Sequence, residues 1–81
     1  MRELLEFIIE NLLGKKDFSI EEATDERGFI NLTVLLDPKD IGLIIGKNGK
    51  TIKAVRSLLR VNATLNKKVF SLNVQEKEAK S

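Results

Sequence analysis

Apolar residues recur at two spacings along the chain, and each spacing predicts one type of element. Between residues 2 and 13, apolar side chains fall every three or four positions and fill one half of a helical wheel, with acidic residues opposite. This pattern predicts an amphipathic helix, which Gly14 is suited to end in a left-handed conformation. Phe7 lies outside the apolar arc, so we expect it at the edge of the core, with a partner contact as the alternative.

Two later stretches alternate apolar and polar residues, which predicts β-strands. Phe18 and Ile20 indicate a short first strand, and residues 30–36 alternate strongly. Between them, the sequence Asp-Glu-Arg-Gly at residues 25–28 has the composition of a tight turn. The two strands are therefore predicted to form a hairpin.

The second half of the chain predicts two helices and one more strand. Asp37 followed by Pro38 is typical of a helix start, because the carboxylate caps the first turn and proline suits the first helical position. That short helix is interrupted at residues 46–49, and a longer helix follows over about 50–63. Alternation over residues 69–74 predicts the third strand.

The order helix, strand, strand, helix, helix, strand indicates an α+β fold, with a three-stranded sheet and helices packed on one face. Its 81 residues fit one domain, predicted over residues 1–75, with a disordered tail over 76–81. The sequence has no cysteine and no histidine, which excludes disulfides, thiol and imidazole catalysis and the usual zinc sites. We therefore expect no enzyme, no cofactor and no metal.

Targeting and membrane segments are not evident in the sequence. Acidic residues interrupt the N-terminal apolar stretch where a signal peptide needs continuity. The longest apolar run, residues 41–45, is far shorter than the roughly 20 residues that span a bilayer. We therefore expect a cytoplasmic protein with no membrane contact.

Charge is segregated along the chain. Residues 1–40 carry five Lys or Arg and ten Asp or Glu, whereas residues 41–75 carry seven Lys or Arg and no acid. This segregation predicts a surface with one positive side, which attracts polyanions regardless of the net charge of +2. An ordinary solvated surface is the alternative interpretation.

The glycine-flanked junction at residues 46–49 is the candidate site. Glycine lacks the Cβ that would hold a ligand backbone at a distance, and it accepts φ values that other residues resist. The next helix begins at once, so its first N–H groups and positive dipole end are expected to face the loop. Lys47 and Lys50 add charge there, and Lys53, Arg56 and Arg60 extend it along one face of the helix. The arrangement predicts a docking ridge for phosphates.

Two other interpretations of this loop have less support. Residues 49–51, Gly-Lys-Thr, resemble the end of a phosphate-binding P-loop, but Ile44 stands where that pattern requires glycine, and a helix precedes the loop. Asn48-Gly49 is also a common hairpin turn. The helical periodicity over 50–63 argues against a hairpin.

Residues 45–52, Ile-Gly-Lys-Asn-Gly-Lys-Thr-Ile, match the I-G-x-x-G-x-x-I signature, so the chain resembles KH domains. The helix and strand before the core resemble the type II arrangement, and the whole chain is similar to the small single-KH proteins of the KhpA family. That resemblance implies single-stranded RNA binding with an RNA-chaperone or post-transcriptional role linked to cell shape and cell wall. It also implies a homodimer or a heterodimer with a KhpB-type partner.

The resemblance further implies which residues contact RNA. The loop would hold the sugar–phosphate backbone, two isoleucines would line an apolar floor beneath the bases, and basic residues of the next helix would screen phosphates. The full set is Ile44, Ile45, Gly46, Lys47, Asn48, Gly49, Lys50, Lys53 and Arg56. The alternatives are single-stranded DNA binding, or a dimerisation or scaffold module whose main role is protein–protein pairing.

Overall fold

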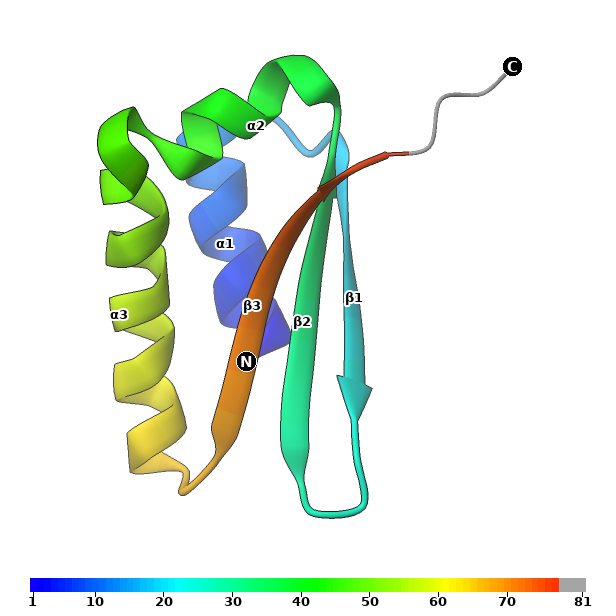
Figure 1. Ribbon diagram of the computed structural model, residues 1–81, viewed down its shortest axis with the longest axis vertical. Helices are drawn as coiled ribbons and strands as arrows, with labels where there is room; N and C mark the ends of the chain where they lie inside the picture. The colour runs from blue at the N-terminus through cyan, green and yellow to red at the C-terminus, as the bar shows by residue number, and fades with distance from the viewer. Residues whose placement is uncertain (78–81) are drawn as a thin grey trace.

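The computed structural model describes residues 1–77 as a three-stranded sheet with helices on one face (Figure 1). The elements are α1 (Arg2–Leu13), β1 (Phe18–Thr24), β2 (Phe29–Leu36), α2 (Pro38–Ile45), the 3₁₀ turn η1 (Lys47–Gly49), α3 (Lys50–Leu65) and β3 (Val69–Glu76). This order confirms the predicted α+β fold. β3 runs one residue past the predicted domain end at 75, and residues 78–81 of the predicted tail lie outside the described residues.

The sheet has the order β1-β2-β3 and mixes both strand directions. β1 and β2 form the predicted antiparallel hairpin, in which the Asp25 carboxylate accepts the backbone N–H groups of Arg27 and Phe29 at 2.8 and 2.9 Å. β2 and β3 are parallel, with Phe29 opposite Val69. Parallel neighbours need a long crossover. Here α2, η1 and α3 supply it, so the candidate loop lies inside the crossover.

The helix ends follow the local signals in the sequence. Gly14 ends α1 with φ 72°, and its N–H donates to the carbonyl of Glu10 at 2.8 Å. Asp37 caps α2 by accepting the N–H of Lys39 at 3.1 Å, and Pro38 occupies the first helical position. α3 runs two residues beyond its predicted end.

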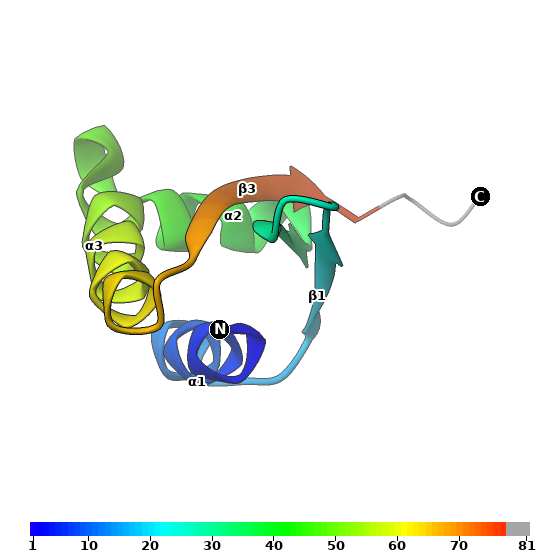
Figure 2. The ribbon, with the colours of Figure 1, turned by 90° about the horizontal axis from the view of Figure 1, so that it is seen from below.

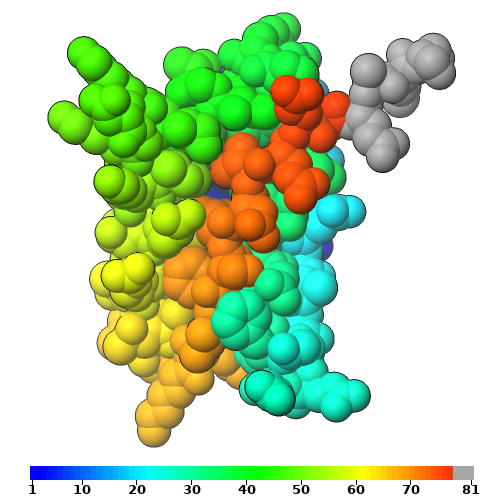
Figure 3. All heavy atoms as spheres, in the orientation of Figure 1, coloured from blue at the N-terminus to red at the C-terminus, as the bar shows by residue number. Residues whose placement is uncertain are grey.

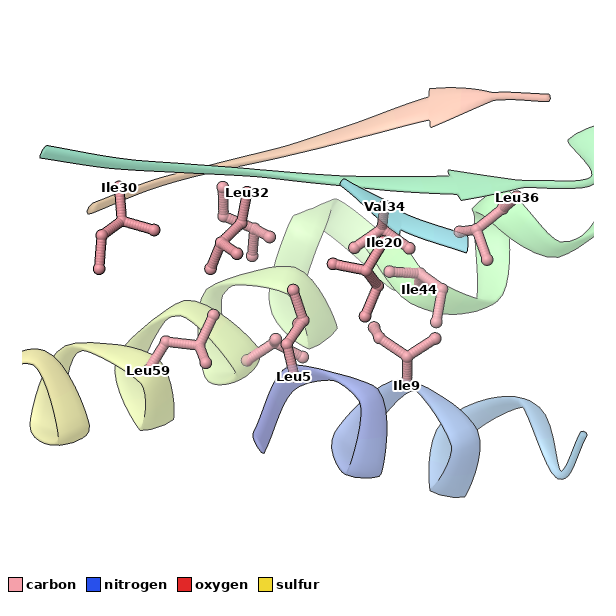
Figure 4. Packing of buried hydrophobic residues seen from close by; sticks show 11 residues of the cluster. Leu5, Ile9, Ile20, Ile30, Leu32, Val34, Leu36, Ile44 and Leu59 are labelled. Carbon is pink, nitrogen blue, oxygen red and sulfur yellow. The ribbon is translucent and has the colours of Figure 1, made fainter. Parts of the chain in front are cut away.

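Alternate residues of the central strand β2 point into a core shared with all three helices. Ile30, Leu32, Val34 and Leu36 are buried there (Figure 4). They pack with residues of α1, α2 and α3, and Figure 2 shows α1 and α3 on the same side of the sheet. The buried hydrophobic residues contributed by the helices are Leu5, Ile9, Ile44, Val55, Leu59 and Ala63.

Two apolar side chains lie elsewhere than predicted. Phe7 is 65% exposed on α1, so the expected place at the core edge is wrong, because this residue lies on the helix side opposite buried Leu5 and Ile9. Leu58 lies in the apolar half of the helical wheel of α3, which predicts burial against the sheet, but it is 54% exposed because α3 packs through Val55 and Leu59. In the described part of the chain, no helix combines the length and the apolarity needed to cross a membrane.

Candidate nucleic-acid interface

The loop between α2 and α3 is a single tight turn at a corner of the molecule (Figure 1). The N–H of Gly46 closes α2 on the carbonyl of Gly42 at 2.9 Å, and the N–H of Gly49 donates to the carbonyl of Gly46 at 3.1 Å. Asn48 and Gly49 have φ values of 56° and 74°. Asparagine and glycine are the residues that accept this left-handed conformation most readily. The residues therefore suit the turn, which projects outward in the space-filling view (Figure 3).

Glycine suits the two ends of the loop for different structural reasons. At Gly46, a Cβ atom would overlap Thr51 Oγ1 and lie 2.8 Å from the backbone nitrogen of Thr51. At Gly49, the nearest atom to such a Cβ is Ile52 Cγ2 at 4.0 Å, so that side of the loop is open. Gly46 thus permits close packing inside the domain, and Gly49 leaves the surface free. The sequence predicts ligand approach at both glycines, whereas the structure adds a packing contact with Thr51 at Gly46.

The backbone N–H groups of the loop contribute less than expected. The sequence predicted unpaired N–H groups facing the ligand at the start of α3. In the structure, the N–H groups of Gly49 and Lys50 donate to the carbonyls of Gly46 and Lys47. Those two donors are therefore occupied, and the positive charge of the site comes mainly from lysine and arginine side chains and the dipole of α3.

A basic face continues from the loop along α3. The residues of this face are exposed, and none of them forms an ion pair with a carboxylate within residues 1–77. The ion pairs in that range are made by Arg2, Lys15, Lys16 and Lys77. We call this set the basic face: Lys47, Lys50, Lys53, Arg56 and Arg60. Because no nearby acid neutralises them, these side chains present their full charge to a ligand.

The apolar part of the predicted site is only partly correct. Ile44 is fully buried among Ile9, Val34 and Leu36 (Figure 4), so it belongs to the core and cannot line a floor beneath bases. Ile45 is half-buried at the end of α2. Leu43 is 59% exposed and was missed, although a run of apolar residues over 41–45 could have indicated it, since one face of a short helix cannot bury them all.

A long-range ion pair fixes the start of α2. Lys15 Nζ lies 2.9 Å from Oδ2 of Asp40, a buried carboxylate. The hydrogen bond to Asp40 raises the pKa of Lys15, against a smaller opposing effect of lost hydration. Lys15 follows the C-terminal end of α1, where its charge suits the helix dipole, and its ion pair also joins the α1–β1 connection to α2. No three potential metal ligands gather within residues 1–77.

Taken together, a mixed three-stranded sheet, helices on one face and a helix–GxxG–helix junction with a basic face define a KH domain. A sequence model described as the KH domain of KhpA/KhpB matches residues 2–75, and the chain belongs to that family.

Curated relatives match over most of their own length. "RNA-binding protein KhpA" of Chlamydia pneumoniae is 39% identical over 79 residues, covering 96% of this chain and 100% of the relative. The protein of the same name from Clostridium perfringens is 38% identical over 85% of this chain and 93% of its own length. The one from Thermotoga maritima is 34% identical over 73% of this chain and 79% of its own length. No solved structure matches the chain.

Proposed function

We propose that this chain binds single-stranded RNA through the loop Gly46–Gly49 and the adjoining basic face, without catalysing a reaction. The observation that carries the proposal is a projecting, glycine-edged turn bordered by exposed basic side chains with no carboxylate partner in residues 1–77. The printed names of the relatives support RNA as the polyanion.

Each part of the site has a distinct role in this proposal. The open side of Gly49 lets the sugar–phosphate backbone approach the turn, while Lys47 and Lys50 contact phosphates as point charges. Lys53 and Arg56 extend the attraction along α3. Ile45 and exposed Leu43 supply the apolar surface for bases, a role that fully buried Ile44 cannot fill.

A charge reversal in the loop tests this site. Lys47→Asp with Asn48→Asp should abolish binding of short single-stranded RNA while the fold is retained, because both positions are exposed and aspartate accepts the left-handed conformation of residue 48. The matched control, Lys68→Asp with Asn73→Asp, makes the same substitutions at exposed positions outside the loop and should bind far better.

Circular dichroism and fluorescence anisotropy measure fold and affinity for both proteins. Unchanged affinity in the loop variant would contradict the proposal. Equal loss in the loop and control variants would instead assign binding to net charge alone. Parallel titration with DNA of the same sequence separates RNA binding from the single-stranded DNA alternative.

We also propose that RNA binding serves a chaperone-like or post-transcriptional role. One module reads about four nucleotides, which gives weak binding suited to transient contact with many RNAs. The resemblance to the KhpA family supports a link to cell shape and cell wall, which cell dimensions after replacing the gene with the loop variant would test.

The second candidate function is pairing with another copy of this chain. Four exposed apolar residues follow each other on α3 at spacings of four, three and four, the pattern of a coiled-coil contact line. We call them the α3 seam: Ala54, Leu58, Val61 and Leu65. The last three are 54, 60 and 78% exposed, and α3 forms one flank of the molecule (Figures 1 and 2).

A second copy fits the α3 seam because each copy offers the same apolar line to the other. The seam is bordered by the neutral residues Thr51, Ser57, Asn62 and Thr64 and by the basic residues Lys50 and Arg60, so pairing also brings like charges close together. Contiguous exposed apolar residues are typical of protein-interaction sites. A KhpB-type partner would use the same seam, and the test below distinguishes pairing with that partner from pairing with a second copy.

Solution mass over a range of concentrations tests pairing. The wild type and Val61→Ile should form dimers, whereas Val61→Asp should stay monomeric because it places a carboxylate in the seam. A wild type that is monomeric at all concentrations contradicts self-pairing. Dimers formed only after addition of a KhpB-type protein would assign the seam to the heterodimer.

A further inference from the structure

The α3 seam is nearly symmetric when its direction is reversed, which determines how two copies can pack. Reversal exchanges Ala54 with Leu65 and Leu58 with Val61. An antiparallel pair therefore sets the smallest residue against the most exposed leucine, and leucine against valine. A parallel pair sets Ala54 against Ala54, which leaves a gap at one end and crowds Leu65 at the other. Opposed helix dipoles also favour the antiparallel pair.

Antiparallel pairing places the two candidate RNA sites far apart. The centre of the seam falls between residues 59 and 60, and the loop lies at the N-terminal end of α3 (Figure 1). Gly49 is about ten residues from that centre, which at a rise of about 1.5 Å per residue is roughly 15 Å. The two loops of a dimer are then about 30 Å apart, at opposite ends of the paired helices.

Resting on the RNA binding and the self-pairing proposed above, we infer that the ligand of the dimer is a bipartite RNA. It has two short single-stranded segments, one for each loop, joined by a spacer that reaches about 30 Å. A single loop reads about four nucleotides, so neither copy alone can hold both segments. Binding of the second segment is intramolecular once the first is bound, which raises affinity without new contacts.

The length of the spacer decides whether one RNA can occupy both loops of the dimer. Two segments that directly follow each other cannot reach both loops and should bind about as tightly as one. Affinity should rise once the spacer spans the gap, and it should fall slowly as the spacer lengthens further, because effective concentration decreases.

Oligonucleotides of defined spacer length test the inference. A screen of tetranucleotides first identifies the segment that the wild type binds best. That segment is then used once, or twice with abasic spacers of increasing length, and affinity is measured by anisotropy. The wild type should bind the best two-segment RNA about 10²-fold or more tightly than the single segment. Val61→Asp should keep the single-segment affinity and lose this gain.

Two controls exclude other causes of the loss. Val61→Ile keeps the seam apolar and should keep the gain. Ala23→Asp adds the same charge at an exposed position of β1, away from the seam, and should also keep it.

Each negative result of the oligonucleotide experiment contradicts a different proposal. Absence of any single-segment binding contradicts the proposed RNA site. Single-segment binding by a dimer with no gain at any spacer length overturns the bipartite ligand and leaves the RNA site intact. The largest gain without a spacer would overturn the antiparallel arrangement, and a gain that persists in Val61→Asp would show that pairing through α3 is not its cause.

Discussion

Alanine substitution of the two loop glycines should separate packing inside the domain from ligand access. Gly46 has φ 76° and ψ 171°, a backbone region used essentially by glycine alone. Gly49 has φ 74° and ψ 16°, in the left-handed helical region. The two positions also differ in free space, because only a Cβ at residue 46 meets Thr51. Both positions lie in the same turn, so each variant serves as the control of the other.

The contacts set the magnitude of each effect. At Gly46, alanine incurs about 1–3 kcal/mol of backbone strain and about 1–3 kcal/mol for the overlap with Thr51. At Gly49, it incurs only the left-handed strain of about 1–2 kcal/mol. In both variants, the lower conformational entropy of the unfolded chain offsets about 0.4–1 kcal/mol of this loss in stability. We therefore expect a loss of about 3–4 kcal/mol for Gly46→Ala and about 1 kcal/mol for Gly49→Ala.

Urea unfolding followed by circular dichroism measures both free energies. A domain of this size has a total stability of about 4–12 kcal/mol, so the larger loss is easily resolved. Gly49→Ala should nevertheless weaken RNA binding, because its methyl group fills the open side of the turn. Adding Thr51→Ala to Gly46→Ala should recover part of the stability by removing Oγ1. Equal losses in the two single variants, or no recovery in the double variant, would refute this account.

Three further predictions concern salt, acid and surface exposure. If three or four phosphates are neutralised, log affinity for RNA should fall with log salt at a slope of about −2 to −3. Self-pairing should instead strengthen with salt, because salt screens the repulsion between two basic domains; sedimentation measures this. The hydrogen bond from Lys77, at 3.0 Å, lowers the pKa of Asp17. This pair therefore stabilises the fold above the ordinary pKa of about 3.9, and the benefit disappears as pH falls through the lowered pKa. Lys77→Met should thus reduce unfolding free energy at pH 7 but match the wild type near pH 2 in urea titrations. Phe7→Ser should change the unfolding free energy by less than about 0.5 kcal/mol, since the ring is mostly exposed, and a larger loss in thermal or urea unfolding would place it in a packed contact.

The elements and the loop could be predicted because their signals are local. The periodicity of α1, the alternation of β2 and the Asp-Pro start of α2 each depend on neighbours within a few residues. The conformations of Asn48 and Gly49 likewise follow from residue type. Such elements can be predicted without knowing which parts of the chain pack together.

What the sequence could not supply depends on contacts between distant residues. A helical wheel puts Leu58 in the apolar half of α3, but only a narrower strip of that half meets the core, since α3 lies at one flank of the molecule. The ion-pair partner of Lys15 is Asp40 on α2. The side chain that excludes a Cβ at Gly46 belongs to Thr51, five residues later, and only the conformation of the turn brings the two residues together. The burial of Ile44 follows from the same packing, which residue type alone did not reveal.

The parallel pairing of β2 with β3 affects when the site exists during synthesis. Phe29 meets Val69, forty residues later, so the sheet closes only after the whole crossover has been made. A nascent chain whose β3 is still inside the ribosome has α2, the turn and α3 without the strand on which α3 partly rests. RNA-binding competence should therefore begin only after β3 has left the ribosome.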